Sequence, residues 1–155
     1  MGLYKSNDEQ AGIERFIEAQ KRDYETALAE IRSGKKETHW IWYIFPQMIG
    51  LGHSYNAHLY GIRDKKEAED YLNDKILGKR LREITSALLE LQGTTANQIF
   101  GGLDAMKVNS SMTLFDHISP DDIFAKVIDR YYDGKRCKLT LQLLNQANDT
   151  QSILF

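Results

Sequence analysis

The stretch Lys36-Glu-Thr-His-Trp-Ile-Trp-Tyr-Ile-Phe-Pro-Gln-Met-Ile-Gly-Leu-Gly-His-Ser54 is the least polar part of a rather polar chain, and we expect the fold to form around it. It contains both tryptophans, one of the two prolines and a run of large apolar or aromatic side chains from Trp40 to Phe45. Three polar side chains, His39, Gln47 and Ser54, are spread through it. This combination predicts a buried element that ends in a sharp turn, with a few polar groups facing a cleft.

Two local structures fit the aromatic run. Thr38 is suited to cap a short helix through Trp40–Phe45, and Pro46 would end it because the residue before a proline disfavours helical backbone. A strand is the alternative, since the run is aromatic and β-branched and its continuous apolarity hides the period. We favour the helix because the rest of the sequence offers no partner strand.

The segment before this stretch predicts a long helix. Ser6-Asn-Asp-Glu9 has capping-box spacing, which places the helix start near Asp8, and Gly34 is suited to end the helix in a left-handed cap. The predicted apolar face leaves Arg15 outside it, and a break near Gln20 is an option.

The segment after it predicts more helices, most of them with a capping or stop signal. They run from Ser54 through Tyr60, from Asp64 to Leu72, from Ile76 to Leu91, from Thr95 through Phe100, from Asp104 to Ile118, from Ser119 to Gly134 and from about Leu139 to Ala147. In Ser119-Pro-Asp-Asp122 we expect Ser119 to cap the helix and Pro120 to be its first residue. The fold class is therefore all-α, one compact multi-helix domain over residues 1–155.

Composition narrows the function classes. A formal charge of -2 gives no general attraction for nucleic acid. No apolar run approaches the roughly 20 residues of a membrane span, and the N-terminus lacks a signal-peptide core. The single Cys137 excludes an internal disulfide, and His53 and His58 have the wrong spacing for zinc on one helical turn. We therefore expect a cytoplasmic protein that needs no metal or cofactor.

Two motifs carry a family resemblance: His39-Trp-Ile-Trp-Tyr-Ile-Phe-Pro-Gln47 and Ser110-Ser-Met-Thr-Leu-Phe115. With Gly50-Leu-Gly-His-Ser54 and Tyr60-Gly-Ile62, they resemble the family numbered 1810 among the domains of unknown function. The resemblance covers about residues 12–145 and implies a compact, mainly helical domain without an assigned activity or catalytic residues. Some members carry a loose calpastatin label, which the globular pattern of this chain does not support. Cys137 is a departure, because many members have an aspartate there.

The turn Gly50-Leu-Gly52 before Ser54 is a candidate anion site. Glycines let the backbone approach a ligand closely, and free N–H groups at a helix start favour phosphate or carboxylate. The structural alternative is an ordinary turn, in which glycine is needed because the backbone has a positive φ. Gln47 is suited either to bind a base, amide or sugar hydroxyl or to cap the preceding helix. His39 is a candidate general base or ligand-binding group, although a structural histidine is the more common case.

A second polar group follows in the chain. Ser110, Ser111 and Thr113 place three hydroxyls together, with Lys107 a turn earlier, which suits phosphate contacts. Hydroxyls bonding back to helix carbonyls are the equally good structural alternative. Trp42 offers a stacking surface for a base or sugar. Cys137 lies between two basic residues that would lower its pKa, but a packed thiol is the favoured interpretation.

Two functions fit these residues. The first is binding or hydrolysis of a phosphate-bearing small molecule, of nucleotide or ADP-ribose type, in a cleft formed by the 47–54 turn and the 107–113 segment. The alternative is a non-catalytic module that binds another protein. We favour the first because core packing alone does not require so many polar groups beside the aromatic residues.

Overall fold

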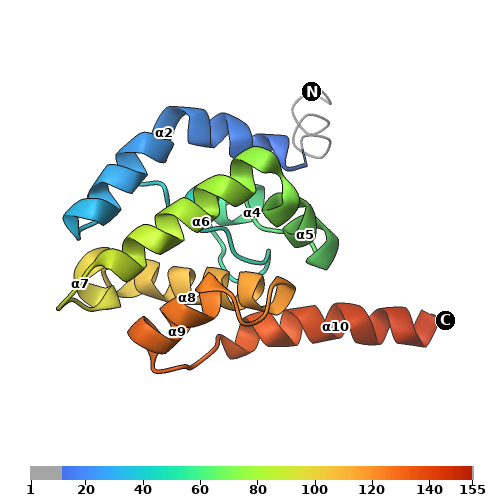
Figure 1. The fold of residues 1–155 in the computed structure, drawn as a ribbon. Coiled ribbons are helices and arrows are strands. Elements are labelled where there is room, and N and C mark those ends of the chain that lie inside the picture. The colour runs from blue at the N-terminus through green and yellow to red at the C-terminus, as the bar shows by residue number, and fades with distance from the viewer. Residues whose placement is uncertain (1–11, 155) are drawn as a thin grey trace.

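Local capping and periodicity signals in the sequence specify the helices, and these helices pack around one central helix. The computed structural model describes residues 12–154, with side chains through residue 146. In that part of the chain it contains helices and no sheet, which confirms the all-α prediction. The helices, labelled in Figure 1, are α2 (Glu14–Ser33), α3 (Ile41–Ile44), α4 (Tyr55–Leu59), α5 (Lys65–Asn73), α6 (Lys75–Glu90), α7 (Ala96–Phe100), α8 (Gly102–Ile118), α9 (Ile123–Tyr132) and α10 (Lys138–Leu154).

Helix α8 is the central element. It packs against α3, α5, α7, α9 and α10, while α6 lies between α2 and α9. The run Ser110–Phe115 is buried on every side of α8. A helix that is buried all round belongs in the middle of a bundle. Of the one-sided helices, α9 packs directly on α8, and α6 joins α9 to α2. Figure 1 shows α2 and α6 on one side of α8 and α9 and α10 on the other.

The aromatic stretch is helical and buried, as predicted. Helix α3 spans Ile41–Ile44, and Trp40 and Phe45 at its two ends are each 1% exposed. The predicted cap is wrong: Trp40 occupies the N-cap position, and the hydroxyl of Thr38 donates to Glu30 instead. The alternative prediction, a strand, is not confirmed. The described residues contain only one isolated parallel β-bridge, between Met48 and Ile62.

Most capping signals are confirmed. Gly34 ends α2 with a left-handed φ of 88°. The side chains of Ser54 and Asp64 accept backbone N–H groups at the starts of α4 and α5, and Thr95 forms a full capping box on α7. These interactions are local in sequence, so the residue types alone specify them.

Three predictions for helix starts and faces need comment. The predicted start near Asp8 lies outside the described residues. Helix α2 runs unbroken past Gln20, and Arg15 is buried at 7% exposure rather than lying off the packed face. The predicted start of α9 is also wrong: Asp122 caps it, and Pro120 lies in the preceding turn.

Arg15 is buried because its charge is matched by a carboxylate from another helix. Its guanidinium donates to both oxygens of Glu67 on α5, at 2.7 and 3.1 Å. It also donates to the carbonyls of Leu59 and Gly61, each at 2.8 Å. These contacts join the start of α2 to α5 and to the segment after α4, which fixes one end of the bundle.

Candidate functional site

A cavity of about 500 Å³ lies beside the first half of α8. Its other walls are the turn that carries Gln47 and the connection from α9 to α10. The apolar lining residues are Leu51, Leu103, Ala105, Met106, Tyr132 and Leu139. The polar lining residues are Gln47, Lys107, Asn109, Ser110, Asp133, Lys135, Arg136 and Cys137. Small-molecule sites commonly occupy about 300–1,000 Å³ and combine apolar walls with a few polar groups, so this cavity has the size and lining of one.

Gln47 reaches the cavity from the turn that follows α3. The parallel bridge holds its backbone: the Ile62 N–H donates to the Gln47 carbonyl at 2.8 Å, and the Ile49 N–H donates to the Ile62 carbonyl at 2.9 Å. Gln47 is only 8% exposed. Its side-chain amide nevertheless makes no hydrogen bond to any residue that the structure describes. The amide is not among the fully buried unpaired side-chain atoms, so it is accessible within the cavity and is available to a polar partner from outside the protein.

Ser110 and Cys137 form a second polar pair in the cavity. Ser110 Oγ lies 3.1 Å from the Met106 carbonyl and 3.4 Å from Cys137 Sγ, and its proton serves these two acceptors. The Cys137 N–H donates to Thr113 Oγ1 at 2.9 Å. Together these contacts join the residue before α10 to the middle of α8.

The pKa of the Cys137 thiol lies below its ordinary value. Burial alone raises that pKa, but hydrogen bonds from Ser110 and from the backbone N–H groups of Leu139 and Thr140 outweigh the burial. Cys137 directly precedes α10, where the first N–H groups have no intrahelical partner and carry a partial positive charge. The thiolate is therefore stabilised by the start of the helix.

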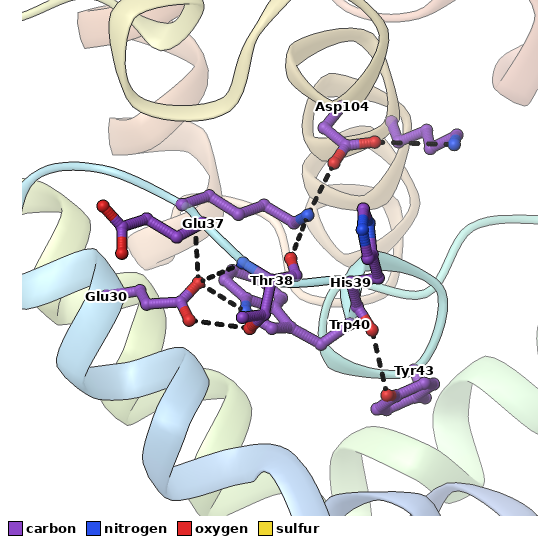
Figure 2. A network of polar contacts seen from close by, with 9 residues as sticks. Glu30, Glu37, Thr38, His39, Trp40, Tyr43 and Asp104 are labelled. Carbon is purple, nitrogen blue, oxygen red and sulfur yellow. Dashed lines mark hydrogen bonds and ion pairs between the residues drawn. The ribbon is translucent and has the colours of Figure 1, made fainter.

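A network that begins at Glu30 on α2 holds the connection to α3. Figure 2 shows the Glu30 carboxylate accepting hydrogen bonds from the N–H groups of Glu37 and Thr38, the Thr38 hydroxyl and the Trp40 indole N–H. Burial tends to raise the pKa of Glu30, but these donors prevail and bring it to about 2. The connection is thus fixed against α2 wherever Glu30 is ionised.

The same connection positions Lys107 on α8. Lys36 Nζ lies 2.9 Å from one oxygen of Asp104, and the other oxygen lies 3.5 Å from Lys107 Nζ. Lys107 Nζ also lies 5.3 Å from the centroid of the Trp42 ring. One long ion pair and one aromatic face orient the Lys107 ammonium, and Lys107 is one of the residues that line the cavity.

The lining of the cavity is positive, in contrast to the net charge of -2 for the whole chain. Lys107, Lys135 and Arg136 contribute cations, and Asp133 is the one acidic lining residue. Arg136 Nε lies 3.1 Å from Asp116, so part of its charge is compensated. A concave site with an excess of one charge raises the local concentration of ligands of the opposite sign. The cavity therefore favours anions.

The mouth of the cavity is apolar. Leu103, Met106 and Leu139 line it and are 77%, 68% and 60% exposed. Together they present apolar side chains beside the positive lining. A ligand with both an apolar and an anionic part would satisfy both features.

The structure brings only part of the predicted site together. Gln47, Lys107 and Ser110 line the cavity, and Trp42 lies against Lys107 without lining it. The indole N–H of Trp42 is buried and has no partner within the described residues. The two segments thus share one cavity through these members.

The other predicted site residues do not line the cavity, and most of them have a role in the fold. Ser54 Oγ already accepts the Ala57 N–H at 3.1 Å, and His39 is exposed on the 34–40 connection. Gly50 has a φ of 100°, and Ser111 and Thr113 are fully buried in α8. A Cβ at Gly52 would lie 2.8 Å from Cβ of Ala57, so this glycine is required for packing of the turn against α4. The cavity does not include these residues.

Sequence reasoning missed the contribution of the connection from α9 to α10. Lys135, Arg136 and Cys137 reach the cavity because α10 packs against α8. The pair of basic residues around Cys137 was a signal for a lowered thiol pKa, and the favoured packed-thiol interpretation did not place it in a cavity. In the part of the chain that the structure describes, no group of three or more histidine, cysteine, aspartate or glutamate side chains is arranged to hold a metal ion. No helix among those residues is long and apolar enough to cross a membrane.

Comparisons with known proteins identify a family and a solved structure that this chain resembles. The family described as "Protein of unknown function (DUF1810)" matches residues 10–144. A solved structure, that of the conserved hypothetical protein Rv1873 from Mycobacterium tuberculosis, is similar with a TM-score of 0.85 and 39% sequence identity. That match covers 86% of this chain and 96% of the other. A comparison with curated proteins found no match.

Proposed function

The chain belongs to the DUF1810 family of proteins of unknown function, and we propose from its cavity that it binds a small phosphate-bearing molecule beside α8. The observation that carries this proposal is the amide of Gln47, which is 8% exposed, lines the cavity and has no hydrogen-bond partner among the described residues. The amide is accessible within the cavity, and no described residue occupies its hydrogen-bonding groups, so they are available to a ligand. A bound ligand would supply the missing partner.

The charges around Gln47 define the ligand class. Lys107 and Arg136 are suited to charge-assisted hydrogen bonds with phosphate oxygens, which are stronger than neutral ones. Ser110 adds a hydroxyl, and the apolar walls suit a base or another flat group. A nucleotide or an ADP-ribose derivative combines these features, with its phosphate on the cations and its polar base or sugar edge on Gln47.

The proposal concerns binding rather than hydrolysis. None of the cavity's lining residues is a histidine, and the single lining carboxylate, Asp133, belongs to the left-handed turn that ends α9. A general base needs to lie within hydrogen-bond reach of the group that it activates. No contact of that kind supports hydrolysis.

Isothermal titration calorimetry tests the proposal directly, with inorganic phosphate, ribose 5-phosphate, AMP and ADP-ribose as ligands. We expect at least one of them to bind, and Gln47→Leu and Lys107→Gln to weaken it about tenfold each, since a lost hydrogen bond to a charged or buried group costs about 1–3 kcal/mol. Lys126→Gln on α9 is the matched control, because Lys126 does not line this cavity. Replacing Gly52 would be uninformative, because the side chain would collide with Ala57.

A second function, protein interaction, is favoured by the exposed apolar mouth formed by Leu103, Met106 and Leu139. Exposed apolar side chains that gather at one place are typical of an interaction surface. If none of the four ligands binds at millimolar concentration while circular dichroism shows a native fold, the interaction module becomes the better explanation.

A further inference from the structure

The one cysteine of the chain lines the cavity that the proposed function assigns to a ligand, and that function makes no use of it. Cys137 is half-buried, with its sulfur beside Ser110 and before the first N–H groups of α10. Thiolates, not thiols, attack disulfides and other electrophiles, and a helix start with added hydrogen bonds favours the thiolate. The pKa of Cys137 is lowered, in agreement with this geometry.

A second polar group in the same cavity is available to another molecule, and it is independent of the thiol. Gln47 is 8% exposed, and its side-chain amide lines the same space and has no partner in the described part of the chain. Gln47 comes from a different segment, and the availability of its amide does not depend on Cys137. A molecule that satisfies Gln47 therefore lies in the same cavity as the sulfur.

The charges of the cavity select which molecules come close to the thiol. Lys107 enters from α8, and Lys135 and Arg136 come from the connection before α10, whereas Asp133 is the one lining carboxylate. These cations act on an incoming ligand: the groups that lower the pKa of Cys137 are hydrogen-bond donors. Anionic reactants are thus concentrated beside the sulfur, and cationic ones are repelled.

We propose that Cys137 is a site of thiol–disulfide exchange, at which a small anionic disulfide held in the cavity transfers one of its halves to the protein. The Cys137 thiolate attacks one sulfur of the disulfide. A bond forms between Cys137 Sγ and that sulfur, the disulfide bond of the ligand breaks, and the other half leaves as a thiolate that takes a proton from water. The disulfide itself is the oxidant. The protein carries a mixed disulfide, and a second thiol reverses the reaction.

This proposal rests on the proposed function in one respect, namely that the cavity admits an anionic molecule. The attached half would occupy the space assigned to the phosphate-bearing ligand, so the modified protein loses that binding. Cys137→Ser keeps a hydroxyl before α10 and removes the thiol, so binding of the phosphate-bearing ligand is measured on it in the absence of any disulfide exchange. The proposal of thiol exchange and the proposal of reversible ligand binding can therefore be refuted independently of each other.

The experiment measures the rate of mixed-disulfide formation by intact-protein mass spectrometry, with glutathione disulfide as the anionic probe and cystamine as the cationic one. Each rate is divided by the rate of the same probe with N-acetylcysteine amide, which removes the intrinsic reactivity of the probe. Because Cys137 is the only cysteine, the mass increase reports this site alone. We expect the normalised rate of glutathione disulfide to exceed that of cystamine by about tenfold or more.

Charge variants separate the proposal from simple exposure of the thiol. Lys107→Gln and Arg136→Gln should each slow glutathione disulfide by about fivefold, the effect of roughly 1 kcal/mol of lost attraction, without slowing cystamine. Lys126→Gln should change neither rate. Equal normalised rates for the two probes would overturn the proposal. So would a folded protein that reacts with both probes more slowly than the urea-unfolded chain, because Cys137 would then be a packed thiol.

Discussion

The buried ion pair between Arg15 and Glu67 makes a large stability effect predictable. The two side chains are 5% and 11% exposed, and the guanidinium also donates to the carbonyls of Leu59 and Gly61. Arg15→Met keeps much of the aliphatic volume but leaves Glu67 buried without its cation. Removing one partner of such a pair costs about 3–5 kcal/mol, whereas an exposed pair contributes about 0–1 kcal/mol.

Urea unfolding followed by circular dichroism measures this cost. For a chain of this length the expected loss corresponds to a fall in Tm of roughly 6–20 °C, at about 2–4 °C per kcal/mol. Arg15→Met/Glu67→Leu should be more stable than Arg15→Met by about 1 kcal/mol or more, because the uncompensated carboxylate is gone. A loss below about 1 kcal/mol in the single variant would refute the argument from burial, since it would place the pair among exposed ones.

Two further predictions test contacts that hold the fold together. Glu30→Gln should lower the unfolding free energy by about 1–2 kcal/mol at pH 7, because hydrogen bonds to a charged acceptor are lost. The folded-state pKa of about 2 lies below the ordinary glutamate value of 4.5, so this stabilisation is complete above about pH 4.5 and is lost as the pH falls towards 2; parallel pH–stability curves for parent and variant would contradict it. Gly78→Ala should cost about 1–3 kcal/mol in thermal denaturation, because its Cβ would lie 2.1 Å from the Leu72 carbonyl oxygen. Gly102→Ala, with 3.6 Å to the nearest atom, is the control and should change stability little.

Local signals predicted the helices well. Ser54, Asp64 and Thr95 each cap the helix that follows within three residues, so residue type and spacing suffice. Thr38 failed as a cap because a distant partner, Glu30, takes its hydroxyl, and the indole of Trp40 joins the same carboxylate. A competing acceptor eight residues away is invisible to a rule based on local spacing.

Non-local contacts explain what the sequence did not predict. Arg15 was expected outside the packed face because periodicity treats every arginine as polar, whereas its burial depends on Glu67, 52 residues away. The cavity likewise needs α10 to pack on α8, which brings Cys137 to Ser110 across 27 residues. Gln47, Lys107 and Ser110 were predicted as site residues because they are polar residues next to strongly apolar runs. That pattern is visible in the sequence.

The central claim is that the side-chain amide of Gln47 receives a ligand in this cavity. The most direct measurement is a ¹⁵N NMR titration of the protein with AMP that follows the side-chain NH₂ of Gln47 and the backbone amides. The account predicts that the Gln47 side-chain signals shift most among the glutamines, together with the amides of Ser110 and Cys137. Shifts confined to the start of α4, from Ser54 to Ala57, or saturating shifts elsewhere with Gln47 unchanged, would contradict it.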